Sequence, residues 1–353
     1  MVSGGIFISG VYFSFQDIAS GAVSVAHPVL NICRDWLQGK TYFELQTSGS
    51  TGVAKKILVS KVQLLASAKS TAEALVINQK DSIYLCLSHE SVGGFMQLIR
   101  AMVWQIDITL VSPASNPFLE MAPKTETLIS LVPLQLFHLL QNTESVHLLN
   151  NFRQVLLGGA AIHPSLIDMI KSLKPSVYHT YGMTETCSHI ALKRLNHWPD
   201  AAFVPLKGIE IGISPENCLW IKGTVTGNIP IQTTDVAAIQ ADGSFEILGR
   251  KDDFINSGGI KINRIELEEK LQSLFPNEIF FFDKVEDVQF GERLILIVQQ
   301  SNVNTENWML ACKKHLPKYH QPKKIFEVKA FELTKSGKID RIKTKDMVLH
   351  GKR

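Results

Sequence analysis

A run of serine, threonine and glycine at residues 47–52 is the first part of the chain with the side chains for phosphate chemistry. Lys55 and Lys56 follow a run that consists of Thr47, Ser48, Gly49, Ser50, Thr51 and Gly52. In a tight glycine-rich loop, backbone N–H groups and hydroxyls can converge on one anion while a lysine supplies the countercharge. Strands are predicted on both sides, at 42–46 and 56–59, and the Gly-Lys-Ser/Thr of a P-loop is missing. The run therefore predicts phosphate binding outside the P-loop fold, with a flexible turn as the alternative.

A second stretch, residues 178–191, places an aromatic ring, a hydroxyl and a carboxylate close together in the sequence YHTYGMTETCSHIA. We expect a strand to end at Tyr178 and run into a glycine-containing turn, after which Thr184 and Glu185 begin a helix. Ligands of open α/β sheets bind at the carboxyl ends of strands, so the Tyr181 ring can stack on a base and Glu185 can hold Mg²⁺ on phosphate oxygens. The alternative is that Thr184 and Glu185 only cap a helix while Tyr181 packs.

Three later segments carry further side chains for nucleotide chemistry. Asp235 is expected to end a strand, where its carboxylate can accept hydrogen bonds from ribose hydroxyls. A polar segment at 249–269 contains Arg250, two aspartates and the pair Gly258-Gly259, and a glycine-bearing loop near the C-terminus presents Lys338. Each signal is weak by itself, because aspartate before a turn and lysine on a surface are commonplace.

Composition describes a globular protein with large cores. The chain has 353 residues, 45% of them hydrophobic, and a formal net charge of +3, which is too small to indicate a nucleic-acid partner. No run of about 18 apolar residues occurs, so no membrane span is expected. The cysteines form no C-x-x-C pair and are odd in number, which argues against a disulfide framework or structural zinc and fits the cytoplasm: Cys33, Cys86, Cys187, Cys218 and Cys312.

The first half of the chain alternates short apolar strands with helical stretches. The N-terminal segment, residues 1–24, is expected to form early strands, and a capping box at Ser60–Gln63 predicts a helix after the 56–59 strand. The alternation is typical of an α/β domain with buried parallel strands, here at 83–87, 108–111 and 154–157, with helices at 94–104 and 134–140.

After residue 202 the sequence becomes rich in Gly, Pro and Thr, and the expected elements are short strands. Short strands at 219–222, 231–234 and 245–248 predict a β-rich subdomain, and a new unit follows the polar segment with helices at 264–274 and 305–315 and strands at 279–282 and 294–299. The expected domains are an N-terminal domain at 1–249, a hinge at 250–252 and a C-terminal domain at 253–353.

The motifs, in this order, resemble those of the adenylate-forming superfamily of acyl- and aryl-CoA synthetases, adenylation domains and luciferases. The resemblance covers roughly residues 42–345. The matching segments are the phosphate loop (47–56), the adenine-side segment (Gly158, Gly159, Ala160, Ala161), the Tyr181–Glu185 motif, the ribose motif (Thr234, Asp235), the hinge (Arg250, Lys251, Asp252) and the catalytic-lysine loop (Ser336, Gly337, Lys338).

This resemblance implies a large N-terminal α/β domain with a β-rich subdomain and a smaller mobile α+β domain. It also implies a two-step reaction with ATP, Mg²⁺ and coenzyme A, in which a carboxylate first forms an acyl-adenylate and pyrophosphate, and CoA then forms the thioester. Lys338 would bridge the carboxylate and the α-phosphate, Glu185 would hold Mg²⁺, and Thr184 would be a further catalytic residue. The loop hydroxyls would contact the leaving phosphates. Asp252 would be the hinge residue, and Gly258-Gly259 would open a passage for the CoA arm.

The chain departs from the family pattern at a few positions. Ala54, Lys56, His179 and Arg264 stand where Pro, Gly, Asn and Pro are usual. Only about forty residues precede the phosphate loop, a shortness that resembles the compact o-succinylbenzoate:CoA ligases of menaquinone synthesis. The expected partner is therefore a small aromatic carboxylic acid.

The segment 89–104 supports an acid with two carboxylates. Gly93, Gly94, Gln97 and Arg100 fall on one face of a predicted helix, and His89 precedes it as a possible pocket-wall residue. A second carboxylate would need a partner such as the Arg100 guanidinium, since a buried charge is costly unless it is paired. The alternatives are that Arg100 pairs with a protein carboxylate or lies on the surface.

Two other functions remain open on the sequence. One is an adenylating enzyme for another acid or for loading a carrier protein, and the other is an inactive nucleotide-binding homologue. A homodimer is a further possibility.

Overall fold

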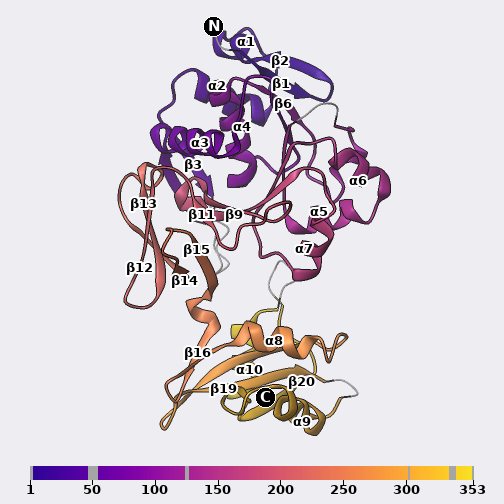
Figure 1. The fold of residues 1–353 in the computed structure, drawn as a ribbon, viewed down its shortest axis with the longest axis vertical. Coiled ribbons are helices and arrows are strands. Elements are labelled where there is room, and N and C mark those ends of the chain that lie inside the picture. Colours follow the sequence, from indigo (N-terminus) through magenta and orange to yellow (C-terminus); the bar gives the residue numbers. More distant parts are fainter. Residues whose placement is uncertain (1–2, 47–54, 124–126, 301–302, 334–338, 352–353) are drawn as a thin grey trace. The chain divides into compact units, whose positions relative to one another are not determined.

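The computed structural model describes residues 3–46, 55–123, 127–300, 303–333 and 339–351 (Figure 1). The chain divides into two compact units, which are called the large unit and the small unit below. The large unit comprises Met1–Ser214, Leu219–Thr233 and Ala238–Glu246, and the small unit comprises Pro215–Cys218, Thr234–Ala237 and Ile247–Arg353. None of the helices within the described ranges has the length and apolar content to cross a membrane.

A nine-stranded sheet with the order β11-β10-β9-β8-β7-β5-β6-β1-β2 forms the centre of the large unit. The neighbours from β9 to β1 are parallel, whereas β2, β10 and β11 are antiparallel additions at the two edges. The prediction of an α/β domain with parallel strands is confirmed. The strands are β1 (Gly5–Ile8), β2 (Val11–Ser14), β5 (Ser82–Leu85), β6 (Asp107–Leu110), β7 (Leu128–Leu131), β8 (Gln154–Leu157), β9 (Ser176–Met183), β10 (Ser188–Arg194) and β11 (Val204–Pro205).

Helices cover both faces of this sheet, as the alternation along β5 demonstrates. Ile83 and Leu85 belong to one hydrophobic core, whereas Tyr84 and Cys86 belong to another. Successive side chains of a strand point to opposite faces, so the two cores lie on the two faces of the sheet. The first core contains residues of α2 (Pro28–Leu37), α3 (Lys61–Leu75) and α4 (Val92–Trp104), and the second contains residues of α5 (Pro133–Leu140), α6 (Thr143–Leu149) and α7 (Pro164–Ile170).

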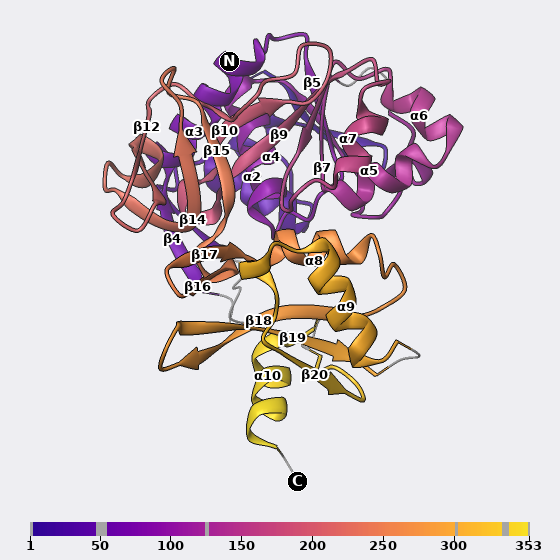
Figure 2. The ribbon, with the colours of Figure 1, turned by 60° about the horizontal axis from the view of Figure 1, so that its bottom comes forward.

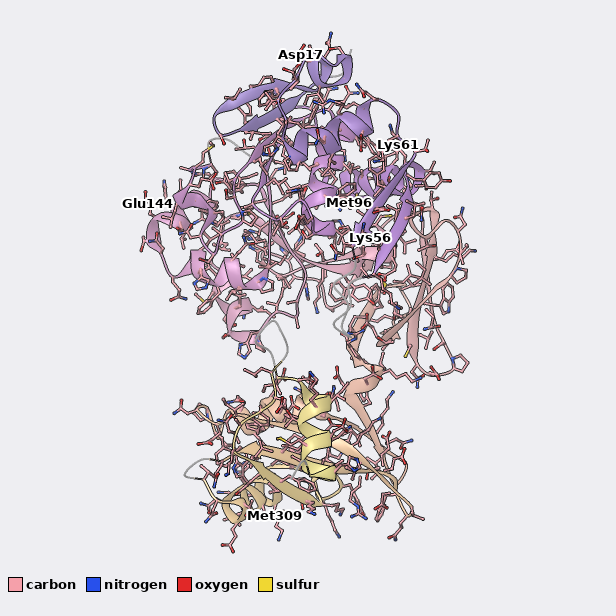
Figure 3. All side chains as sticks on the ribbon, turned by 180° about the vertical axis from the view of Figure 1, so that it is seen from behind. Asp17, Lys56, Lys61, Met96, Glu144 and Met309 are labelled. Carbon is pink, nitrogen blue, oxygen red and sulfur yellow. The ribbon has the colours of Figure 1, made fainter. Side chains whose placement is uncertain are left out.

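Local sequence signals fix the helices that approach the site. The predicted capping box is present: Ser60 accepts from the backbone of Gln63, whose side chain bonds back to Ser60. Helix α4 is deeply buried, with Met96 in the interior of the large unit (Figure 3). The N-terminal segment was expected to form strands only, but β1 and β2 are followed by α1 (Phe15–Ser20), which Ser14 caps.

Two smaller sheets complete the N-terminal two thirds of the chain. Strands β3 (Tyr42–Gln46) and β4 (Lys56–Ser60) form the predicted antiparallel pair on either side of the 47–54 segment. A four-stranded sheet has the order β12-β13-β14-β15 and corresponds to the predicted β-rich subdomain. Its strands are β12 (Ile209–Ile213), β13 (Cys218–Gly223), β14 (Ile231–Ile239) and β15 (Phe245–Arg250).

The small unit packs helices on both faces of a five-stranded sheet (Figure 2). Helices α8 and α9 share one hydrophobic core around Trp308, and α10 packs against the other, which contains Phe281. Helix α9 has the predicted bounds, whereas β20 and α10 were not predicted. The elements are β16 (Phe254–Ser257), β17 (Ile260–Asn263), α8 (Arg264–Gln272), β18 (Phe280–Asp287), β19 (Gly291–Gln299), α9 (Thr305–His315), β20 (Lys324–Val328) and α10 (Arg341–His350).

Candidate active site

The adenine-side segment predicted at residues 158–161 follows β8, beside the end of β9. Leu157 and His179 are paired across these two parallel strands, and the Thr180 hydroxyl donates to the Leu157 carbonyl at 3.0 Å. A Cβ atom on Gly158 would lie 2.5 Å from the Thr180 Oγ1, and Gly159 has a φ of +84°. Gly158 is therefore favoured by its close approach to the Thr180 side chain and Gly159 by its left-handed backbone. Together they bring the 158–161 segment, with Ala160, to the edge of the sheet where Tyr181 also lies.

Tyr181 sits in a cluster of aromatic rings that the sequence did not reveal. Its ring centroid lies 5.7 Å from that of Phe203 and 5.3 Å from that of Phe245, and the latter two rings stack on each other at 5.6 Å. Such contacts fix the orientation of the Tyr181 ring, which remains partly exposed. Phe203 and Phe245 meet through an isolated β-bridge far along the chain, so no local pattern indicates their role.

His179, one of the departures from the family pattern, packs against the same cluster, 5.1 Å from Phe203. Burial lowers its pKa to about 4, a backbone hydrogen bond with Ala160 acts in the opposite direction, and the charge of Lys193 lowers the pKa further. The imidazole is therefore neutral near pH 7 and is linked to the adenine-side segment.

The expected helix after Tyr181 is wrong. Strand β9 continues through Gly182 to Met183, a single 3₁₀ turn covers Thr184–Thr186, and the chain returns as β10. The Thr186 hydroxyl accepts from the Met183 N–H and donates to the Ser188 carbonyl, which closes the turn before a helix can form. A Cβ on Gly182 would lie 2.2 Å from that carbonyl.

The turn displays the predicted metal ligand at the end of β9. Thr184 is buried, whereas the side chain of Glu185 is partly exposed. A partly exposed carboxylate is the type of oxygen ligand that Mg²⁺ accepts in one or two positions while phosphates and water supply the rest. Glu185 therefore fits a magnesium ion carried by a nucleotide.

Asp235 and Arg250 form the predicted ribose and hinge positions on neighbouring strands of the small unit. The Arg250 Nη2 donates to the Thr234 hydroxyl at 2.8 Å, and its Nε lies 3.6 Å from the Asp235 Oδ1. Asp235 was expected to end its strand, but β14 continues to Ile239. The guanidinium therefore orients the Asp235 carboxylate.

The predicted hinge residue Asp252 is exposed within a 3₁₀ turn, Lys251–Asp253. Arg264, another departure from the family pattern, is the first residue of α8 and pairs with Asp253 at 2.9 Å. That ion pair is largely buried and ties the helix to the residue next to Asp252, a contact that a proline at position 264 could not make.

Gly258 and Gly259, predicted at the CoA passage, form the turn between β16 and β17 with φ values of +60° and +81°. The Gly258 N–H donates to the Phe290 carbonyl at 2.8 Å. A Cβ on Gly258 would lie 3.1 Å from the Phe290 ring, so the pair serves a left-handed turn as well as a close approach.

Several predicted residues lie outside the described residues. They are Thr47, Ser48, Gly49, Ser50, Thr51 and Gly52 of the phosphate loop, and Lys338. Lys55 is described and is exposed just before β4.

Arg100 lies in α4 and is 1% exposed, so it is not a surface residue. Its Nη2 lies 3.3 Å from the His189 Nδ1, 3.4 Å from the Ser188 Oγ and 3.5 Å from the Thr71 Oγ1. Among the residues that the structure describes, no carboxylate lies within ion-pair distance of the guanidinium, and its Nε has no hydrogen-bond partner. Both alternatives considered for Arg100 therefore fail in this part of the chain.

Burial lowers the pKa of Arg100 to about 9, which leaves the guanidinium charged at pH 7. A buried cation without an anion is costly. Arg100, Thr71, Ser188 and His189 are called the Arg100 cluster below. Its chemistry fits a bound anion.

The other two predicted substrate residues lie near the start of α4, with Gly94 in its first turn and His89 on the segment before it. A Cβ on Gly94 would lie 2.1 Å from the Ser88 carbonyl oxygen, so glycine permits the helix to start against this backbone. His89 is partly buried and lines a cavity of about 200 Å³ at the carboxyl ends of β1, β5 and β6. Arg100 is not among the residues that line this cavity.

Comparison with known proteins decides the family. A family model described as AMP-binding enzyme matches residues 38–237, more than half of the chain. The chain belongs to the AMP-binding enzyme family. This finding confirms the resemblance drawn from the motifs and, with the solved structures, the adenylate-forming fold.

Two solved structures of AMP-binding enzymes are similar to this chain. An acyl-CoA synthetase (AMP-forming)/AMP-acid ligase II-like protein from Dyadobacter fermentans is 32% identical with a TM-score of 0.65, and the match covers 94% of this chain and 97% of that one. The O-succinylbenzoate Coenzyme A synthetase of Bacillus subtilis, in complex with ATP and magnesium, is 25% identical with a TM-score of 0.68, over 86% of this chain and 69% of that one.

A curated relative points to the same subgroup. The 2-succinylbenzoate–CoA ligase of Staphylococcus epidermidis is 28% identical over 327 residues, which cover 85% of this AMP-binding enzyme and 68% of that protein. This chain is thus nearly coextensive with the Dyadobacter protein and spans about two thirds of the ligase.

Proposed function

We propose that this AMP-binding enzyme is an ATP-dependent acid:CoA ligase and that its acid is o-succinylbenzoate, which carries two carboxylates. The names of its relatives support the reaction. The observation that carries the substrate is Arg100, a buried guanidinium with no carboxylate partner among the described residues. A ligand carboxylate in the Arg100 cluster would supply the missing anion.

The reaction has two steps. In the first, one carboxylate of the acid attacks the α-phosphorus of ATP, which forms the acyl-adenylate and releases pyrophosphate. In the second, the thiol of CoA attacks the acyl carbon and AMP leaves. Phosphoryl transfer of this kind depends mainly on positioning and on stabilising charge.

The chain's own residues have distinct tasks in this proposal. Lys338 would bridge the carboxylate and the α-phosphate, and the hydroxyls at 47–52 would hold the leaving phosphates. Glu185 would hold Mg²⁺, which neutralises phosphate charge when it is bound. Arg100 binds the carboxylate that does not react, so that the other one is oriented for attack.

In this proposal the adenine contacts groups at the carboxyl ends of β8 and β9, and the ribose contacts Asp235, which lies within β14. Tyr181, whose ring is fixed by Phe203 and Phe245, stacks on the adenine, and the 158–161 segment lines its edge. Asp235, oriented by Arg250, accepts hydrogen bonds from the ribose hydroxyls. The 3₁₀ turn at Asp252 is the hinge between the 1–249 and 253–353 domains, and Gly258-Gly259 admits the CoA arm.

Acid-dependent pyrophosphate release from ATP and Mg²⁺ tests this function, with and without CoA. The acids are o-succinylbenzoate, 4-oxo-4-phenylbutanoate, which lacks the ring carboxylate, and 2-butyrylbenzoate, which lacks the chain carboxylate. We expect release with o-succinylbenzoate to exceed release with either analogue by at least about 100-fold in kcat/KM, because loss of a charge-assisted contact costs about 3 kcal/mol or more. Equal use of all three acids would refute the substrate.

The same assay separates the alternatives. Pyrophosphate release without thioester formation on CoA would favour a carrier-protein acceptor, and a failure to bind ATP would favour an inactive homologue. A cytoplasmic location and a homodimer are also proposed, and sedimentation at micromolar concentration measures the latter.

A further inference from the structure

We propose that His189 is a positioning residue that holds Arg100 in place without neutralising it, and thereby reserves the guanidinium for the second carboxylate of the acid. The inference rests on the proposed function for the identity of the acid. Its physical basis is the Arg100 cluster, whose contacts hold the buried guanidinium but do not neutralise its charge.

The hydrogen bonds fix the state of the imidazole. The Thr71 hydroxyl donates its single proton to the Ser67 carbonyl at 2.8 Å. Its contact of 3.0 Å with the His189 Nε2 must therefore use the ring N–H as donor. That tautomer leaves a lone pair on Nδ1, the atom that lies 3.3 Å from the Arg100 Nη2.

The guanidinium contacts the ring over more than one atom, since its Nη2 also lies 3.4 Å from the His189 Nε2. A neutral imidazole offers electron density to a cation at this distance, whereas a protonated ring would repel it. Burial and the charge of Arg100 together keep the pKa of His189 well below its ordinary value. The pair therefore carries a net charge of +1 at neutral pH.

Within the described part of the chain, the other side chains that contact the Arg100 guanidinium are uncharged. Ser188 and Thr71 present hydroxyls to the guanidinium, and Thr71 is fixed in turn by its bond to Ser67. Helices α3 and α4 and strand β10 thus surround the cation with neutral donors and acceptors. Breaking up a buried ion pair leaves an uncompensated charge, so a buried arginine is usually paired with a carboxylate, whereas the ring that contacts Arg100 here is the uncharged imidazole of His189.

Three substitutions separate the properties of the imidazole. His189→Gln keeps a donor for Thr71 and an acceptor for Arg100, His189→Leu removes both, and His189→Glu places a competing carboxylate beside the cation. The measured quantity is the ratio of kcat/KM for o-succinylbenzoate to that for the better one-carboxylate analogue. We expect this ratio to fall by about 10-fold or more in His189→Leu and by about 100-fold in His189→Glu, mainly through a higher KM for the dicarboxylate. In His189→Gln the ratio should stay within about threefold of the wild-type value.

A double-mutant cycle gives a readout that does not depend on activity. In the wild-type background, His189→Glu supplies the missing anion, so we expect the melting temperature to rise by about 2–4 °C. In the Arg100→Met background the same substitution buries an unpaired carboxylate, so the melting temperature falls.

The two readouts distinguish the possible failures. The wild-type protein could fail to activate the dicarboxylate while His189→Glu still raises the melting temperature in the wild-type background and lowers it in the Arg100→Met background. In that case the proposed substrate fails and the contact between His189 and Arg100 stands. If the effects at positions 189 and 100 are additive, or if His189→Leu lowers activity with all acids equally, His189 is only a packing residue and the inference is overturned.

Discussion

Replacing Arg100 by methionine should make the protein more stable and less selective at the same time. Methionine has similar length and no charge, so the substitution removes a buried cation while it largely preserves packing in α4. A pKa lowered from 12.5 to about 9 corresponds to a cost of about 5 kcal/mol for holding the guanidinium charged in the folded protein. This cost is the source of the expected gain.

The gain is partly offset by lost contacts. The Nη2 hydrogen bonds with Thr71, Ser188 and His189 are long, and each contributes about 0.5–1 kcal/mol. We therefore expect Arg100→Met to raise the free energy of unfolding by about 2–3.5 kcal/mol, which lies within the range of about 1–4 kcal/mol found when buried ionic groups give way to apolar side chains. In parallel, kcat/KM for o-succinylbenzoate should fall by about 100-fold or more, with little change for the one-carboxylate analogue.

Urea unfolding at pH 7 measures the first quantity, and pyrophosphate release measures the second. Arg153→Met is the matched control, because Arg153 is exposed and pairs with Asp81 at 2.8 Å. Breaking that pair should lower stability and leave acid selectivity unchanged. The reasoning is refuted if Arg100→Met lowers the free energy of unfolding by more than about 2 kcal/mol, since the guanidinium would then be paired rather than uncompensated.

Three further predictions address the nucleotide side of the reaction. Lys338→Ala should abolish pyrophosphate release while the melting temperature is unchanged, and normal turnover in this variant would remove Lys338 from the mechanism. Asp252→Pro should slow thioester formation more than adenylation in single-turnover assays, whereas equal slowing of both steps would argue against a hinge. The pKa of His179, lowered to about 4, gives stability that is complete above the unfolded value of 6.5 and is lost as the pH falls toward 4. Between pH 7.5 and 5, the wild type should thus lose about 1–2 kcal/mol more unfolding free energy than His179→Asn, and parallel urea curves for the two proteins would contradict this.

Elements with strong local signals were predictable from the sequence. The capping box at Ser60 sets the start of α3, and the apolar runs around β5 and β8 are long enough to predict buried strands. The antiparallel pair β3–β4 follows from alternation on either side of the glycine-rich run. In these cases the residues that decide the structure are neighbours in the sequence.

The environment of Arg100 could not be predicted, because its partners come from distant elements. Thr71 lies on α3, and His189 follows a turn in which Cys187 has a left-handed backbone conformation. The pairing of β9 with β10 also shifts register between His189 and Ala191. Alternation along the strand therefore does not tell which face His189 occupies, although the side chain was visible in the quoted motif.

The expected helix at Thr184 failed for a related reason. Threonine followed by glutamate is a common helix start, but the hydroxyl of Thr186 bonds to the backbone on both sides of the turn. Tertiary pairing with β10 then outweighs the local preference.

The most direct test of the central claim is a product analysis of a single turnover with o-succinylbenzoate, ATP and Mg²⁺. Without CoA, the protein should release one pyrophosphate per active site and retain an acyl-adenylate of the dicarboxylic acid, which mass spectrometry identifies. Addition of CoA should convert it to one thioester and one AMP. Release of ADP and phosphate, or an adenylate that forms equally well with an acid lacking the second carboxylate, would contradict the account.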